Sequence, residues 1–129
     1  MQQELQPNQV YCFEDFELDT WRGQLRRQGE LIVSEPKVFE LVHYFVRNPD
    51  RLVTKNELLE VIWSGQCVSE SVLNVAISKL RTALGERQGR RFVENHYGRG
   101  YRFVQPVRIV EGNPKPAKVQ AGTVASFDS

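Results

Sequence analysis

The sequence predicts a small α+β domain, and three observations support this fold class. Residues 10–33 contain short segments with partly alternating apolar and polar side chains, which is typical of paired strands. Three segments with apolar residues three and four positions apart follow, as in amphipathic helices. Two final apolar segments in residues 91–104 flank a glycine-rich turn. We therefore expect an N-terminal antiparallel four-stranded sheet, three helices and a C-terminal β-hairpin within residues 10–107.

The first part of the chain is expected to form a meander. Its strands are Val10–Phe13, Phe16–Asp19, Leu25–Arg27 and Leu31–Val33. Turn-forming residues separate them at Thr20–Gly23 and Gln28–Glu30. A sheet this small must lay one face on the helices to be stable. We interpret Phe13, Phe16 and Trp21 as packing residues, because they lack the interleaved basic residues of single-strand nucleic-acid binders.

The first helix is expected between Ser34 and Asn48. Ser34 offers a capping hydroxyl, Pro36 suits a first turn, and Asn48-Pro49 ends the helix. Its buried stripe consists of Val38, Leu41, Val42 and Phe45. His43 has no carboxylate or second histidine at ligand spacing, so we interpret it as a structural residue and not as a metal ligand.

The second and third helices are joined by a short polar loop. Thr54 and Glu57 match the capping-box pattern at the start of the second helix, which runs to about Trp63. Its expected buried residues are Leu58, Leu59 and Ile62. Residues 64–68 form the loop, and the third helix covers Ser69–Leu84. Two helices joined by so short a loop are a candidate helix-turn-helix.

The third helix has one apolar face and one polar face of mostly short side chains. Its apolar stripe is Leu73, Ala76, Ile77, Leu80 and Leu84. The opposite side carries Ser71, Asn74, Ser78, Lys79, Arg81 and Thr82. Such a face fits a DNA major groove about 12 Å wide and offers hydrogen-bond donors and acceptors to base edges. The same pattern also fits an ordinary amphipathic helix with a solvated face.

Charge is distributed unevenly along the chain. The net charge is +1, but residues 1–75 hold seven Lys or Arg against twelve Asp or Glu. Residues 76–108 reverse this balance, with eight basic residues against two acidic ones. A basic segment favours a polyanionic partner, because phosphate contacts supply most of the non-specific affinity for nucleic acids. Charge clusters are also common on solvated surfaces, so this observation is supporting only.

Other protein classes find little support in the sequence. It contains no run of about 18 apolar residues for a membrane segment and no secretory signal. Cys12 and Cys67 are interpreted as free thiols of a reducing compartment, which predicts a cytoplasmic location. There is no nucleophile elbow, phosphate-binding glycine loop or pair of catalytic carboxylates, and His43 and His96 have no visible partners. We expect no enzyme activity, no cofactor and no metal site.

A glycine-flanked arginine marks the C-terminal hairpin. The strands are expected at Arg91–Asn95 and Tyr101–Val104. Gly98 and Gly100 on either side of Arg99 permit a tight turn. An arginine at such a tip suits a narrow minor groove, where the negative potential is enhanced. A plain surface hairpin with a solvated arginine fits these residues equally well.

The order of these elements, together with four spaced motifs, resembles the winged-helix DNA-binding domain of the OmpR/PhoB family. The motifs are Glu35-Pro36-x-x-Phe39-x-Leu41, Val53-Thr54-Lys55-x-Glu57-Leu58-Leu59-x-x-x-Trp63, Val75-x-Ile77-x-x-Leu80-Arg81-x-x-Leu84 and Gly98-x-Gly100-Tyr101-Arg102-Phe103. The arrangement looks closest to ToxR/CadC-like regulators, in which a sensor or membrane segment follows the winged helix. The resemblance implies a winged helix-turn-helix over residues 10–107. Outside it we expect a flexible N-terminus (1–9) and, because residues 111–129 lack apolar periodicity, a linker or disordered tail (108–129).

The resemblance also implies a function and a set of site residues. The function is sequence-specific binding of double-stranded DNA by a bacterial transcriptional regulator, which can be the cytoplasmic domain of a larger, membrane-anchored protein. The recognition helix, residues 69–84, would lie in the major groove, and the wing, residues 95–101, at the adjacent minor groove or backbone. Base contacts would come from Ser71, Asn74, Val75, Ser78 and Lys79. Backbone contacts would come from Lys55, Trp63, Arg81, Thr82 and Asn95, and wing contacts from Tyr97 and Arg99.

Some of these positions depart from the family pattern. Many members have an arginine where this chain has Tyr97 and a threonine or valine where it has Arg99. Serines at 71 and 78 replace arginines of some members, so base specificity cannot be transferred. By chemistry, Asn74 can pair bidentately with adenine, and Val75 can contact a thymine methyl.

Further partners follow from the resemblance. Family members often contact RNA polymerase through the loop that corresponds to residues 64–68 and bind tandem half-sites as weak head-to-tail dimers. The alternative hypothesis is a winged-helix interaction module that contacts RNA polymerase or a partner regulator through protein surfaces. Such binding would be insensitive to salt and to Lys79 or Arg99. No receiver domain with a phosphoacceptor aspartate is visible, so we do not expect control by phosphorylation on this chain.

Overall fold

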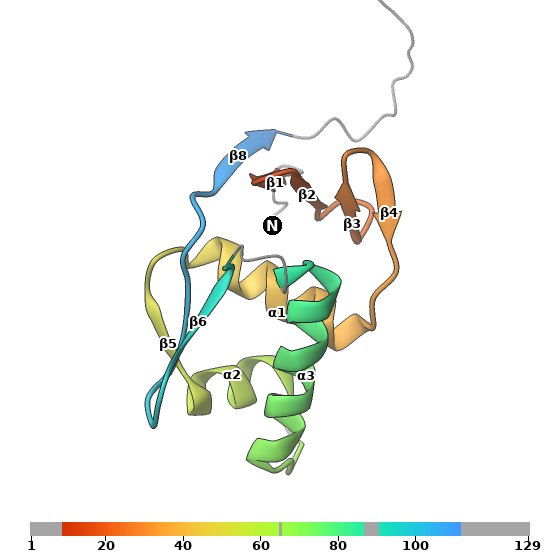
Figure 1. Cartoon of the computed structure of the whole chain (residues 1–129). Helices are drawn as coiled ribbons and strands as arrows, with labels where there is room; N and C mark the ends of the chain where they lie inside the picture. The colour runs from red at the N-terminus through yellow and green to blue at the C-terminus, as the bar shows by residue number, and fades with distance from the viewer. Residues whose placement is uncertain (1–8, 65, 87–90, 112–129) are drawn as a thin grey trace, which may run out of the picture.

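The computed structural model describes residues 9–64, 66–86 and 91–111 (Figure 1). Three helices are present in these residues: α1 Pro36–Arg47, α2 Lys55–Ile62 and α3 Glu70–Ala83. One antiparallel sheet has the strand order β4-β3-β2-β1-β8, with β1 Gln9–Phe13, β2 Phe16–Asp19, β3 Gln24–Arg27, β4 Glu30–Ile32 and β8 Arg108–Glu111. The wing sheet has the order β5-β7-β6, with β5 Leu52–Thr54, β6 Val93–His96 and β7 Gly100–Phe103. No described helix is long and apolar enough to cross a membrane.

The N-terminal sheet has one strand more than the sequence predicts. Strands β1 to β4 form the expected meander, but residues 108–111, which were expected to belong to the tail, form β8 and pair antiparallel with β1. In this register Val110 lies opposite Val10. The segment was missed because four residues with two adjacent apolar side chains, Ile109 and Val110, show no clear periodicity. The fold therefore continues past residue 107 to Glu111.

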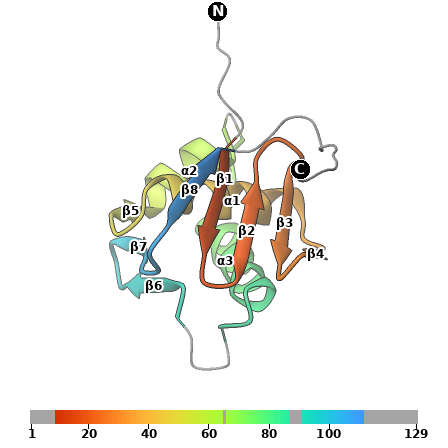
Figure 2. The ribbon, with the colours of Figure 1, turned by 90° about the horizontal axis from the view of Figure 1, so that it is seen from above.

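The inner face of the five-stranded sheet lies on α1 and α3 (Figures 1 and 2). Buried aromatic rings join this sheet to the rest of the domain. Phe13 on β1 meets Phe103 of the wing sheet edge to face, with ring centroids 5.3 Å apart, and Phe92 at 6.0 Å. Phe45 of α1 also stacks on Phe103, with ring centroids 6.3 Å apart. Phe13 and Phe16 are thus packing residues as predicted.

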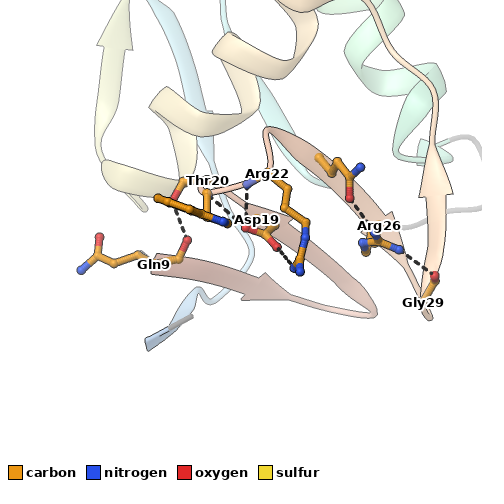
Figure 3. A network of polar contacts seen from close by, with 8 residues as sticks. Gln9, Asp19, Thr20, Arg22, Arg26 and Gly29 are labelled. Carbon is orange, nitrogen blue, oxygen red and sulfur yellow. Dashed lines mark hydrogen bonds and ion pairs between the residues drawn. The ribbon is translucent and has the colours of Figure 1, made fainter. Parts of the chain in front are cut away.

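Trp21 does not pack in the core as the sequence analysis expects, since 56% of its surface is exposed. The turn that contains it is closed by Asp19 (Figure 3). Oδ1 of Asp19 accepts hydrogen bonds from the backbone N–H groups of Trp21 and Arg22, and Oδ2 pairs with the Arg22 guanidinium at 3.2 Å. Thr20 Oγ donates to the Gln9 carbonyl at 2.7 Å. These polar contacts set the turn conformation, which directs the indole outward.

The helix starts agree only partly with the predicted capping residues. The N-cap of α1 is Glu35 and not Ser34, it makes no side-chain capping bond, and Pro36 occupies the first turn. Proline at this position needs no N–H partner, which explains why the helix starts here without a capping hydroxyl. At α2, Thr54 Oγ1 accepts a hydrogen bond from the Glu57 N–H at 3.1 Å, as the capping box predicts. The Glu57 carboxylate instead binds partners outside the helix.

Gly100 allows β7 to approach β5 closely. A Cβ atom at this position would lie 2.1 Å from the Val53 carbonyl oxygen and 2.8 Å from the Thr54 Cα. We expect Gly100→Ala to lower the free energy of unfolding by about 1–3 kcal/mol or more, because the strands must separate to admit the methyl group. Urea denaturation measures this loss. Gly29→Ala is the control, since Gly29 has a positive φ but open space around it. Equal losses for both variants would contradict the steric explanation.

Glu57 predicts an acid-sensitive contribution to stability. Its carboxylate accepts hydrogen bonds from the Arg51 guanidinium (2.6 Å) and the Tyr44 hydroxyl, and these bonds lower the pKa of Glu57. A lowered pKa in the folded state stabilises the protein above the unfolded-state pKa of about 4.3, and this stabilisation is lost as the pH falls through the folded-state value. The stability difference between the parent and Glu57→Gln should therefore be largest at neutral pH and shrink below about pH 4.

Urea unfolding between pH 7 and pH 3 measures this difference. Glu60→Gln is the matched control, because Glu60 is an exposed carboxylate of the same helix and makes no hydrogen bond or ion pair through its side chain within residues 9–64, 66–86 and 91–111. A pH-independent difference for Glu57→Gln would contradict the prediction.

Candidate nucleic-acid interface

The outward face of α3 carries short side chains. The apolar stripe is buried as predicted, through Leu73, Ala76, Ile77 and Leu80. The opposite face exposes Ser71, Val75, Ser78 and Thr82, which are four, three and four residues apart and therefore adjacent on one side of the helix. Val75 is 53% exposed, and the Ser71 hydroxyl contacts only that of Ser69, at 2.7 Å, among the contacts of the described residues. Within the described domain, this face is uncovered.

One flank of α3 is joined to the start of α2 and to the wing sheet by polar contacts, which we call the α3–wing seam. The seam consists of Lys55 Nζ with Glu70 Oε2 (2.5 Å), the Tyr101 hydroxyl with Asn74 Oδ1 (3.2 Å), and the Arg81 guanidinium with the Val93 carbonyl (3.1 Å). Glu70, Asn74 and Arg81 are four and seven residues apart, so they form one line along the helix. The seam therefore holds the helix in a defined position beside the hairpin.

Glu86 strengthens the seam at its C-terminal end and was not identified from the sequence. One carboxylate oxygen, Oε2, accepts hydrogen bonds from the backbone N–H groups of Phe92 and Val93, both at 2.8 Å. The other, Oε1, lies 3.3 Å from Arg81 Nε. Arg81, expected to contact the DNA backbone, is thus engaged within the protein, with a third of its side chain exposed. The only sequence signal is the position of Glu86 directly after Gly85, which ends the helix.

The other flank of α3 faces the start of α1. Lys79 Nζ lies 2.8 Å from Glu35 Oε2, and both side chains are largely exposed. Trp63, expected to contact phosphate through its indole N–H, is only 6% exposed. Lys37 lies over its ring at 5.9 Å and donates to the Ile62 carbonyl at 2.7 Å. This flank therefore combines an accessible ion pair with a largely covered indole.

The hairpin turn is the most exposed part of the wing sheet. Tyr97 is 88% exposed, and Gly98 has a φ of +74°, which glycine adopts without strain. The Arg99 N–H donates to the His96 carbonyl at 2.9 Å, and the Arg99 guanidinium makes no hydrogen bond or ion pair within residues 9–64, 66–86 and 91–111. Asn95 is exposed on β6. Figure 1 shows this turn at the same end of the molecule as α2 and the start of α3.

The cations near α3 differ in their partners. Lys55 and Lys79 each pair with a carboxylate, and the hydrogen bond that Lys55 donates to Glu70 raises the pKa of the Lys55 ammonium. The Lys55 ammonium therefore remains positively charged at neutral pH. Since exposed ion pairs contribute little net stability, a DNA phosphate can replace the carboxylate at low cost. The Arg99 guanidinium has no carboxylate partner in the part of the chain that the structure describes, so it can meet a phosphate without first giving up an ion pair.

Neither histidine lies in a catalytic or metal-binding arrangement in the described residues. His43 packs between the rings of Tyr11 and Phe39, and burial lowers the pKa of its imidazole. His96, for which the sequence shows no partner, lies with its Nε2 3.1 Å from Glu94 Oε1. No group of three or more His, Cys, Asp and Glu side chains in residues 9–64, 66–86 and 91–111 is placed to hold a metal ion.

The Glu86 contacts predict a loss of stability on truncation. Glu86→Ala removes the acceptor for two backbone N–H groups of fully buried residues, Phe92 and Val93. An unsatisfied buried donor costs about 1–3 kcal/mol, so we expect a loss of at least this size in the free energy of unfolding. Urea denaturation is the measurement, and Glu60→Ala, on the exposed side of α2, is the matched control. Similar losses for the two variants would show that Glu86 does not hold β6.

Comparison with known proteins identifies relatives of the chain. The sequence model of the family described as "Transcriptional regulatory protein, C terminal" matches residues 29–103, more than half of the chain. The transcriptional regulator HilA of Salmonella typhimurium is 34% identical over 103 residues, which are 80% of this chain and 18% of HilA. The chain thus spans about a fifth of that relative.

Solved structures agree with this assignment. The response regulator DrrB of Thermotoga maritima, an OmpR/PhoB homologue, is 29% identical and superimposes with a TM-score of 0.67 over 74% of this chain and 44% of DrrB. The DNA-binding domain of CadC from Escherichia coli shares the fold, with a TM-score of 0.69 over 80% of this chain and 96% of that domain at 24% identity. These likenesses confirm the winged-helix fold that the sequence predicts.

Proposed function

The chain belongs to the family of transcriptional regulatory protein C-terminal domains of the OmpR/PhoB type, and on this premise we propose that it binds specific sites in double-stranded DNA through α3 and the wing. The observation that carries the proposal is the uncovered outward face of α3, held by the α3–wing seam beside an exposed, arginine-bearing turn. An α-helix with its side chains is about 10–12 Å across and fits a major groove of about 12 Å.

The outward face supplies the proposed base contacts. The hydroxyls of Ser71 and Ser78 can donate to or accept from base edges, and the exposed Val75 can contact a thymine methyl. Asn74 reaches the bases from the seam side and Lys79 from the opposite side. These side chains are short, so the helix must lie deep in the groove for them to reach the bases.

The surrounding residues supply the proposed backbone contacts. Thr82 and Asn95 are exposed at the edges of the face, and Lys55 can exchange Glu70 for a phosphate. Arg81 contributes mainly by holding β6 in place, since its guanidinium is engaged with Val93. Tyr97 and Arg99 extend from the turn towards the adjacent minor groove, where an unpaired guanidinium is favoured by the negative potential.

We propose further contacts with other proteins through a second surface of the domain. Exposed apolar side chains, Val61 on α2 and Val72 on α3, flank the loop that carries Cys67, itself exposed. This surface is suited to a protein partner, and we propose RNA polymerase as that partner, with weak homodimers forming on tandem half-sites in the cytoplasm. Binding to protein alone, without DNA, is the alternative function.

Random-site selection with the purified chain tests the proposal. We expect enrichment of one short motif, and titration of the selected duplex at two salt concentrations should show affinity that falls as salt rises, because phosphate contacts release counterions. Failure to enrich any motif, or binding that is insensitive to salt, would favour the protein-interaction alternative.

Asn74 provides a test at the level of one base pair. We expect Asn74→Ala to weaken binding to the selected site by about 1–3 kcal/mol and to relax preference at a single position. Competition between duplexes that differ at that position measures the preference. Gln24→Ala on β3 is a control that removes a carboxamide from the other sheet. If Asn74→Ala binds all duplexes as the parent does, α3 does not read bases through this residue.

A further inference from the structure

We propose that Tyr101 is a positioning residue: its hydroxyl fixes the orientation of the Asn74 carboxamide and so restricts the base edge that Asn74 can read. The inference rests on the proposed binding of DNA through α3. The Tyr101 O–H donates to Asn74 Oδ1 over 3.2 Å. Tyr101 is only 3% exposed, whereas Asn74 is exposed. The buried Tyr101 side chain thus fixes the accessible Asn74 side chain through a hydrogen bond.

The phenol of Tyr101 is itself well fixed. Tyr101 lies on β7, the middle strand of the wing sheet, opposite Val53 of β5 and Asn95 of β6. The preceding Gly100 brings the strand into close contact with β5. The following Arg102 pairs with Glu94 at 3.0 Å. Because Gly100 is packed against β5 and Arg102 is paired with Glu94, Tyr101 presents its hydroxyl to α3 from a defined position.

The hydrogen bond makes the two ends of the carboxamide unequal. An asparagine side chain has one acceptor oxygen and one NH2 donor, and a free carboxamide can turn to present either of them. Here Oδ1 is directed to the wing by Tyr101, so Nδ2 is the atom left to face a bound base. The bidentate pairing with adenine that the sequence analysis considered requires both atoms to face the base.

A donor-only side chain selects base edges that carry acceptors. In the major groove guanine presents the acceptors N7 and O6, whereas cytosine presents the N4 amino donor. We therefore expect guanine to be preferred and cytosine to be rejected at the base that Asn74 contacts. Because the protein fixes the carboxamide before binding, the complex loses less side-chain freedom when it forms.

Tyr101→Phe tests the inference, since it removes only the hydroxyl and keeps the ring in the core. The base position is first identified as the one at which Asn74→Ala loses preference. We expect Tyr101→Phe to bind the selected site but to reduce the guanine-to-adenine and guanine-to-cytosine affinity ratios there by about 2- to 10-fold, the effect of one hydrogen bond. Tyr11→Phe is the matched control, because Tyr11 is also buried and donates to the Gln9 side chain at 3.0 Å.

Two further measurements address the same carboxamide. In Asn74→Asp both oxygens are acceptors, so Tyr101 can still donate and the preference should change from guanine to cytosine or adenine, which carry amino donors. Replacement of the guanine by 7-deazaguanine, which lacks the N7 acceptor, should weaken binding of the parent and leave Asn74→Ala unaffected.

The outcomes separate this inference from the proposed function. A parent chain that selects no DNA motif would overturn the proposed function itself. A parent that binds specifically, together with a Tyr101→Phe variant whose base ratios are unchanged, would overturn only the role of Tyr101. A Tyr101→Phe variant that binds every duplex more weakly by the same factor would also overturn it, because that result assigns the hydroxyl to general affinity or folding.

Discussion

The α3–wing seam is the constraint on which the candidate interface depends. Recognition of two neighbouring grooves requires the helix and the hairpin turn to keep a defined separation, which the chain segment between Ala83 and Val93 does not by itself impose. The seam provides this through a line of polar contacts at Glu70, Asn74 and Arg81. Glu86 completes it by binding the backbone at the start of β6. The aromatic cluster under the sheets supports the same arrangement from the core side.

The seam also changes how the charged and polar residues of the interface should be understood. Lys55, Asn74 and Arg81 have the chemistry of DNA contacts, yet each already has a partner within the domain. Their partners orient them, and the carboxylates of Glu70 and Glu86 lower the local excess of positive charge. The residues free to adapt to a ligand are the short ones, such as Ser78 and Val75. In the proposed DNA complex, discrimination between sites would rely on a few well-placed atoms, and general affinity would rely on the exchange of carboxylates for phosphates.

The sequence predicted the elements whose signals lie in neighbouring residues. It missed the features that depend on contacts between separate segments of the chain. Apolar periodicity located all three helices, and the Thr54 capping bond formed as expected because its partners are three residues apart. The β8 strand was missed because its pairing partner lies about 100 residues away at β1. The inward contacts of Arg81 were likewise invisible, since they depend on Glu86 and on the path of the chain to Val93. A family motif shows that an arginine is present, but it does not show whether that arginine contacts other residues of the domain or a ligand.

The pairing of β8 with β1 has a mechanical consequence. Gln9 lies opposite Glu111, so the two ends of the described chain leave the sheet side by side at one corner. Tension applied between these ends would break the hydrogen bonds of this strand pair one after another, starting at the Gln9–Glu111 pair. It would not stretch all of them at the same time. The domain would therefore yield first at β8, at the margin of the five-stranded sheet and away from α3, so β8 would separate while α3 and the hairpin stayed packed together.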